Sequence, residues 1–216
     1  MKRTVYCCQW IEVVTMVCFV VGFVVFFAKT GSSIGTEMVF VGSALLAMMW
    51  RKEPLTSVGL CWNARWQDML ALIAACGVSG LVLFLGSVVL KRVGMGWLLP
   101  VAVPSGSKLA WILRQFVQVA FCEELFFRGY VQGRIRVLLK PVCLGKDHIL
   151  ALASIMISSG VFAIAHCLVW GHWAGLMTFF PGLVLGWLFW RTGGLLEPVL
   201  YHGLANIGYV MLLSKG

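Results

Sequence analysis

Seven long runs of mostly apolar residues divide the chain, and their length limits what it can fold into. An α-helix needs about 20 residues to cross the ~30 Å hydrocarbon layer of a bilayer. The runs lie at residues 10–28, 34–50, 67–90, 108–139, 148–170, 172–190 and 195–213. Hydrophobic residues make up 61% of the chain and charged residues only 12%, which excludes an ordinary soluble domain. The sequence therefore predicts an all-α fold, a polytopic transmembrane bundle of about seven (six to eight) helices.

The connections between these runs are too short to hold a second domain. They carry turn residues, as in "RKEPLTSVG" and "RTGG". We therefore expect residues 1–216 to form a single integral membrane domain, in which residues 1–100 supply N-terminal membrane helices. The fourth run would be about 48 Å long as one straight helix. For this reason we expect its first part, residues 105–118, to lie along the membrane surface.

The net charge of +9 is distributed unevenly between the two ends of the predicted helices. A cytoplasmic N-terminus places ten basic residues on the cytoplasmic side and five on the other. The ten are Lys2, Arg3, Arg51, Lys52, Arg65, Arg134, Arg136, Lys140, Lys146 and Arg191, and the five are Lys29, Lys91, Arg92, Lys108 and Lys215. This bias follows the positive-inside rule and supports a cytoplasmic N-terminus. The basic charge is thus expected to face the lipid bilayer and its anionic headgroups, and no nucleic-acid partner is expected.

Eight cysteines are scattered along the chain, mostly within the apolar runs. Their spacing fits neither a disulfide framework nor a zinc knuckle, so we interpret most of them as small buried hydrophobic residues. Cys122 and Cys167 directly adjoin candidate site residues, but a catalytic thiol is not favoured.

Three charged residues interrupt the fourth apolar run, in "FCEELFFRGY" at residues 121–130. A charged side chain at the bilayer centre costs about 2.5–3.5 kcal/mol on insertion scales, so these three must be paired, hydrated or functional. Glu124 and Arg128 are spaced i, i+4 with the acid first, which favours an ion pair within one helix. Glu123 points about 100° away from Glu124 and is left without that partner. A purely structural interpretation is that both carboxylates share Arg128 within a packed bundle.

Two further polar clusters lie in predicted membrane helices. The segment "VFAIAHCL" places His166 four residues after Phe162, on the same helical face. The segment "LEPVLYHGLANIGY" places His202 and Asn206 at i, i+4, again on one face. A lone histidine in an apolar helix is more often a packing residue than a catalyst. Two histidines, an asparagine and an unpaired glutamate on three helices can instead supply a general base, proton carriers and oxyanion donors to one polar site.

The segments "EELFFRG", "FAIAH" and "LFWRTGGLLEPVLYHGLANIG" together resemble the three signature motifs of the CPBP family of intramembrane proteases. That family includes the type II CAAX prenyl endopeptidases. The pattern EExxxR, then FxxxH, then HxxxN is complete and in order. The resemblance covers about residues 108–213, which it marks as a catalytic core, and it implies hydrolysis of a peptide bond within the membrane.

The resemblance also implies a role for each motif residue. Glu123 and His166 correspond to the pair that activates the attacking water, and His202 and Asn206 to the pair that stabilises the oxyanion. It points to glutamate-type catalysis with no metal or cofactor. The alternative is zinc, because Glu123, His166 and His202 could supply a His₂Glu site with one open position.

Glu124 and Arg128 correspond to the second glutamate and the arginine of the first motif, which we interpret as supporting residues. The expected partner is a membrane-anchored protein or peptide substrate, such as a C-terminal sorting tail, in a bacterial inner membrane. Two other functions stay open. One is a non-catalytic peptide-binding or bacteriocin-immunity-type membrane protein, and the other is a transporter or proton-coupled channel, since embedded Glu and His residues also mark ion paths.

Overall fold

The computed structural model describes residues 2–30, 36–61, 65–96, 106–143 and 145–213. These residues are 88% helical, and no strand occurs among them. Their helices form a bundle of seven, which confirms the predicted fold class. Of the basic residues assigned above, Lys215 lies outside the described residues, as do residues 34–35 of the second predicted run.

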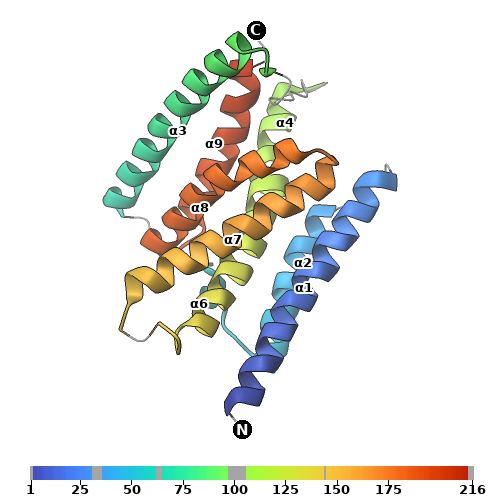
Figure 1. Ribbon diagram of the computed structural model, residues 1–216, viewed down its shortest axis with the longest axis vertical. Helices are drawn as coiled ribbons and strands as arrows, with labels where there is room; N and C mark the ends of the chain where they lie inside the picture. Colours follow the sequence, from blue (N-terminus) through green and yellow to red (C-terminus); the bar gives the residue numbers. More distant parts are fainter. Residues whose placement is uncertain (1, 31–35, 62–64, 97–105, 144, 214–216) are drawn as a thin grey trace.

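The N-terminal half contains three long helices; the second and third end close to the predicted boundaries, while the first begins at Lys2, eight residues before the predicted run 10–28. Helices α1 (Lys2–Thr30) and α2 (Thr36–Arg51) lie side by side, as Figure 1 shows in blue. After α2 a short 3₁₀ turn, η1 (Leu55–Val58), leads toward α3 (Trp66–Arg92). The turn ends at Gly59, whose φ of 80° is a conformation that glycine adopts without strain.

One long helix runs without a break from residue 108 to residue 139. The residues that join its segments all have right-handed helical dihedral angles. Two of its segments, η3 and η4, are π-helical. The segments are α4 (Lys108–Arg114), η3 (Gln115–Ala120), α5 (Phe121–Glu124), η4 (Leu125–Gln132) and α6 (Gly133–Leu139).

The prediction that residues 105–118 lie along the membrane surface does not match this helix. Residue 105 lies outside the described residues, and α4 continues the line of the helix instead of turning across it (Figure 1). The physical reason is that η3 packs against α9 and is thereby held inside the bundle. Gln115, a polar residue of this segment, has its hydrogen-bond partner within the protein.

The C-terminal half contains α7 (Asp147–Trp170), the 3₁₀ segment η5 (Trp173–Thr178), α8 (Phe179–Thr192) and α9 (Leu196–Leu213). Glycines with positive φ follow α7 and α8 and end both helices, as is common at helix C-termini. Helix α7 packs against α8 and the long helix, while α9 packs against α3 and η3.

Four stretches among the described residues are long and apolar enough to cross a membrane: Gln9–Thr30, Trp66–Arg92, Asp147–Trp170 and Trp173–Thr192. They show that the chain is an integral membrane protein. The long helix differs from them in its middle, where it carries Glu123, Glu124 and Arg128 and where all eight residues of η4 are buried. Helices α2, α7 and α8 and the turn η1 surround η4, so the charges of this segment lie in the protein interior.

The close packing of η5 on α7 depends on Gly175. A Cβ atom at this position would lie 2.5 Å from the backbone nitrogen of Cys167 and 2.7 Å from the carbonyl carbon of His166. Real Cβ atoms do not approach backbone so closely. Only glycine therefore lets η5 lie against α7 beside His166.

We expect Gly175→Ala to push η5 away from α7 and to lower the thermal unfolding temperature of the purified protein. Gly160→Ala is the matched control, because a Cβ there meets nothing within 4 Å. In a helix interior that control replacement adds helix propensity and is expected to be neutral or stabilising. Equal unfolding temperatures for the two variants would show that the contact is not needed.

Candidate active site

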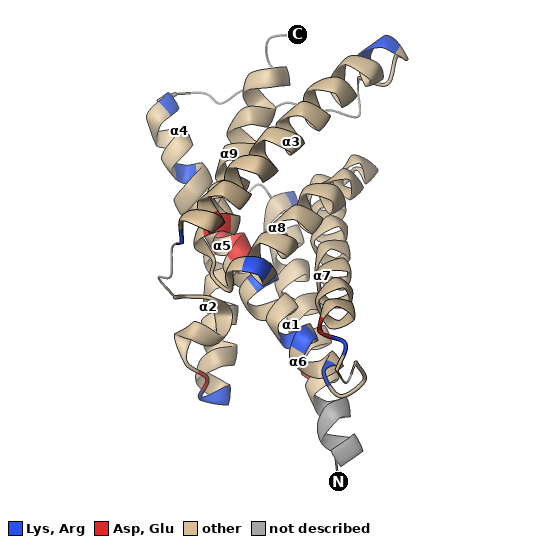
Figure 2. Ribbon diagram, turned by 90° about the vertical axis from the view of Figure 1, so that its left-hand side faces the viewer, with Lys and Arg blue, Asp and Glu red and all other residues tan. Residues whose placement is uncertain are grey.

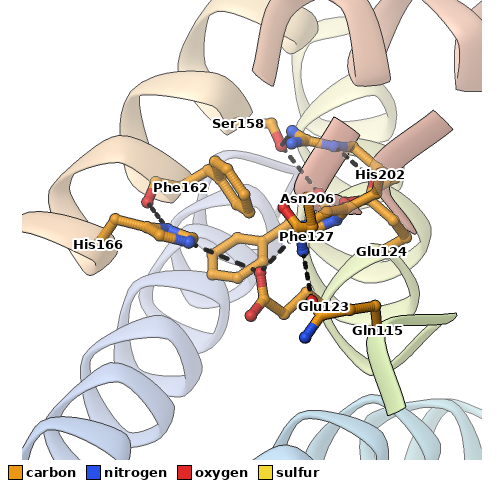
Figure 3. Close-up of polar contacts among 10 residues, drawn as sticks. Gln115, Glu123, Glu124, Phe127, Ser158, Phe162, His166, His202 and Asn206 are labelled. Carbon is orange, nitrogen blue, oxygen red and sulfur yellow. Dashed lines mark hydrogen bonds and ion pairs between the residues drawn. The ribbon is translucent and has the colours of Figure 1, made fainter. Parts of the chain in front are cut away.

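The predicted site residues come together where the long helix, α7 and α9 meet (Figure 3). Each of these three elements contributes at least one ionisable or amide side chain. They are Glu123 and Glu124 from α5, His166 from α7, and His202 and Asn206 from α9. Residues that are up to 83 positions apart in the sequence, 123 to 206, thus share one small region of the fold.

Glu123 is the centre of this arrangement. Its Oε2 lies 3.8 Å from His166 Nε2 and 4.0 Å from His202 Nε2. Both distances are too long for a direct hydrogen bond. Within the described part of the chain, this buried oxygen has no hydrogen-bond partner. The side chain is 16% exposed, so Glu123 is a largely buried carboxylate with one oxygen left available.

Both histidines present the same ring nitrogen to Glu123. His166 Nδ1 lies 3.0 Å from the carbonyl oxygen of Phe162, which can only accept a hydrogen bond, so Nδ1 carries the proton. His202 Nδ1 donates in the same way to Glu124 Oε1 at 2.8 Å. In the neutral form of each ring, Nε2 is therefore an acceptor that faces Glu123.

Glu124 is fully buried and its two carboxylate oxygens have different partners. Oε2 accepts a hydrogen bond from Arg128 Nε at 3.0 Å, which confirms the predicted i, i+4 ion pair. Oε1 accepts the bond from His202, a contact that the sequence did not predict. Glu124 therefore orients His202. The interpretation in which both glutamates share Arg128 is wrong for the described ion pairs, because Glu123 Oε2 faces the two histidines instead, at 3.8 and 4.0 Å.

Arg128 connects the long helix to α7. Its Nη1 donates to Ser158 Oγ at 3.1 Å, and Ser158 donates in turn to the carbonyl oxygen of Phe127 at 2.8 Å. The guanidinium carbon lies 4.9 Å from the centre of the Phe162 ring, a cation–π distance. Ser158 was not predicted, although two adjacent serines in the apolar stretch "IMISSGVF" were a signal for it.

Asn206 is oriented by Gln115, another residue that the sequence did not assign to the site. Asn206 Nδ2 donates to Gln115 Oε1 at 3.0 Å. Gln115 is the first residue of the π-helical segment η3, and α5 with its two glutamates lies between η3 and η4. A π-helical turn shifts the direction of the side chains that follow it, so no regular helical spacing could have related Gln115 to Glu123.

The two cysteines next to site residues point to backbone groups. Cys122 Sγ donates to the carbonyl oxygen of Val117 at 3.7 Å, and Cys167 Sγ donates to that of Trp173 at 3.6 Å. These contacts fit the interpretation of both thiols as packing residues.

The distances around Glu123 can be compared with those of a tetrahedral zinc site. In a tetrahedral site with bonds of about 2.0–2.1 Å, ligand atoms lie roughly 3.3–3.4 Å apart. The separations of 3.8 and 4.0 Å between Glu123 and the two histidines are longer. Among the described residues, no group of three or more His, Cys, Asp or Glu side chains is arranged to hold a metal ion.

A comparison with protein families gives a match over residues 104–208, to the family described as Type II CAAX prenyl endopeptidase Rce1-like. The matched segment contains every residue of the site described above. These residues belong to the Rce1-like CAAX endopeptidase family. Searches of curated proteins and of solved structures found no match.

This family membership identifies the kind of activity. The chain is a hydrolase, an intramembrane CAAX-type protease embedded in the membrane, and it acts on membrane-associated substrates. The CAAX protease segment covers the long helix, α7, α8 and most of α9, so α1, α2 and α3 lie outside it.

The buried pair of Glu124 and Arg128 is open to a direct test. Arg128→Ala leaves the Glu124 carboxylate buried with a single partner, and breaking a buried ion pair in this way costs about 3–5 kcal/mol. We expect a lower thermal unfolding temperature and lower abundance in the membrane. Arg136→Ala is the control, because Arg136 is exposed on the same helix. An Arg128→Ala protein that is fully stable yet inactive would place Arg128 in the chemistry.

Proposed function

We propose that the protein hydrolyses a peptide bond of a membrane-anchored protein, or of a C-terminal sorting tail, with a water molecule activated by Glu123 and His166. The observation that carries this proposal is the unpartnered Oε2 of Glu123, which is buried and faces two histidine nitrogens. A carboxylate oxygen is rarely buried without a partner, and such exceptions often mark a catalytic role.

The 3.8 Å separation between Glu123 Oε2 and His166 Nε2 suits one bridging water. Hydrogen bonds of about 2.8 Å from the water to each atom span this distance. Since both atoms are acceptors, the water donates a proton to each of them. Its lone pairs then point away from Glu123 and His166, toward the carbonyl carbon of a bound peptide.

The reaction can be balanced with these groups alone. As the water oxygen bonds to the carbonyl carbon, one of its protons passes to the Glu123 carboxylate and the carbonyl oxygen becomes an oxyanion. When the oxyanion collapses, the C–N bond breaks and the proton moves from Glu123 to the leaving nitrogen. The products are a new carboxyl group and a new amine, and Glu123 is again a carboxylate.

His202 and Asn206 supply donors for the oxyanion in this proposal. Asn206 Nδ2 carries two protons and gives one to Gln115, so the second is available. His202 donates from Nε2 when its ring is protonated, and the Glu124 carboxylate at Nδ1 stabilises that positive charge. Each such donor contributes roughly 10²–10³ to the rate in other enzymes.

The proposed setting is a bacterial inner membrane with the N-terminus in the cytoplasm. The larger number of basic residues at that end of the helices supports this orientation. No cofactor takes part in the proposed mechanism.

Glu123→Gln is the variant that tests the proposed base, because it keeps the shape of the side chain and removes its basicity. We expect turnover of a cognate membrane-anchored substrate to fall by about 10²–10⁴-fold. The protein should still accumulate in the membrane with an unchanged unfolding temperature. Cys122→Ala, at the preceding residue, is the control and should retain activity. Substantial turnover by Glu123→Gln would refute the assignment.

A second experiment tests whether the reaction needs a metal ion or a cysteine thiol. With water held directly by Glu123 and His166, strong chelators should leave the rate unchanged, and Cys167→Ala should keep substantial turnover. Elemental analysis of the active protein gives an independent measurement. Stoichiometric zinc that is lost together with activity would instead support the zinc alternative.

A further inference from the structure

A second set of buried polar groups lies on the long helix, beyond the candidate active site. Tyr130 at 2% exposure and Arg134 at 7% exposure are both more than nine-tenths buried. The Tyr130 hydroxyl and two nitrogens of Arg134, Nε and Nη2, have no hydrogen-bond partner within the described residues. The proposed hydrolysis uses neither side chain. A buried donor without a partner is destabilising, so these atoms need an explanation.

Two ion pairs surround these donors. Arg134 Nη1 donates to Glu53 Oε1 at 3.1 Å, and two nitrogens of Arg51 contact the two carboxylate oxygens of Glu12. The charges of both pairs act on the Tyr130 hydroxyl, so all five residues form one cluster between α1, α2 and the long helix. Each carboxylate in it already has an arginine, and the groups left over are donors.

The free atoms of Arg134 have a particular geometry. Nε and Nη2 lie on the same edge of the planar guanidinium group, so their N–H bonds are parallel and match two oxygens of a carboxylate or phosphate. The hydroxyl of Tyr130, one helical turn earlier, adds a third donor. The two free nitrogens of Arg134 can only donate, and the Tyr130 hydroxyl can donate as well as accept, so the set favours an oxyanion as its ligand.

The position of the cluster in the bundle identifies the class of oxyanion. Lys and Arg residues gather at the ends of α2 and α6 (Figure 2), where Lys52, Arg136 and Lys140 are exposed. Such a basic end of a transmembrane bundle meets the headgroup layer of the bilayer, where phosphate groups are abundant. Arg134 follows Glu123 by 11 residues, about 16 Å along the helix, so the two sites are separate.

We propose that Arg134 and Tyr130 form a phosphate-binding site, occupied by the headgroup of an anionic phospholipid or by free phosphate. Nε and Nη2 of Arg134 donate to two phosphate oxygens, and the Tyr130 hydroxyl donates to the same anion. The bound group stabilises the native protein, because a ligand that binds only the folded state shifts unfolding to higher temperature.

The experiment measures thermal unfolding of the full chain, purified in a phosphate-free neutral detergent. Three additions are compared: phosphatidylglycerol, phosphatidylcholine and inorganic phosphate. We expect phosphatidylglycerol to raise the unfolding temperature by several degrees more than phosphatidylcholine does. A rise with inorganic phosphate but no difference between the two lipids would identify free phosphate as the ligand of the same site. No rise with either anion would overturn the proposal.

Two variants and one control locate the effect. Arg134→Lys keeps the positive charge but lacks the two parallel N–H donors of the guanidinium group, so it should lose most of the rise in unfolding temperature. Arg136→Gln removes an exposed charge nearby and should keep it. A folded Arg134→Lys protein with the full rise, or an equal loss in Arg136→Gln, contradicts the site. If Arg134→Lys does not accumulate, Tyr130→Phe is tested in its place. A smaller rise in unfolding temperature on adding the anion supports the proposal, and an unchanged rise overturns it.

Discussion

The buried chain of contacts from Arg128 through Glu124 to His202 is the interaction on which the site depends. It joins η4, α5 and α9, and Ser158 extends it to α7. Removing charged groups from water costs several kcal/mol per ion, and the interior offsets this only where each group has well-placed partners. Here both Glu124 oxygens are bonded, and Arg128 contacts the carboxylate, a hydroxyl and the Phe162 ring, although its Nη2 has no hydrogen-bond partner among the described residues. The charges therefore hold the helices in register at the point where the chemistry is proposed.

This network gives two adjacent glutamates opposite properties. Glu124 is fully buried with both oxygens satisfied, while Glu123 is 16% exposed and keeps one oxygen free. Neighbouring residues on a helix point about 100° apart, so one can face the packed interior and the other the histidines. The fixed Nδ1 contacts of His166 and His202 direct both Nε2 atoms toward that free oxygen. The support of the site and its reactive group are thus supplied by consecutive residues.

The helices were largely predictable, because apolar runs of bilayer length leave few alternatives. The predicted run 67–90 became Trp66–Arg92, and 148–170 became Asp147–Trp170. The pairing of Glu124 with Arg128 was also predictable, since it depends only on spacing within one helix. The expected surface location of residues 105–118 was inferred from the length of the run, and it does not match the continuous helix. The position of this segment depends in part on Gln115. Its partner, Asn206, lies 91 positions away in the sequence.

The sequence by itself determined that this chain spans a membrane, how many helices it forms and which polar residues they carry. Those properties follow from length, hydropathy and short-range spacing, which act within a single helix. Only the tertiary structure decided that Glu124 bonds to His202 as well as to Arg128, and that Gln115 orients Asn206. It also decided that Nε and Nη2 of Arg134 have no hydrogen-bond partner among the described residues. The first two contacts join residues 78 and 91 positions apart, and the third property depends on the absence of a partner near a buried atom. They are set by how the helices pack and by the π-helical turns around α5, and no local pattern encodes either.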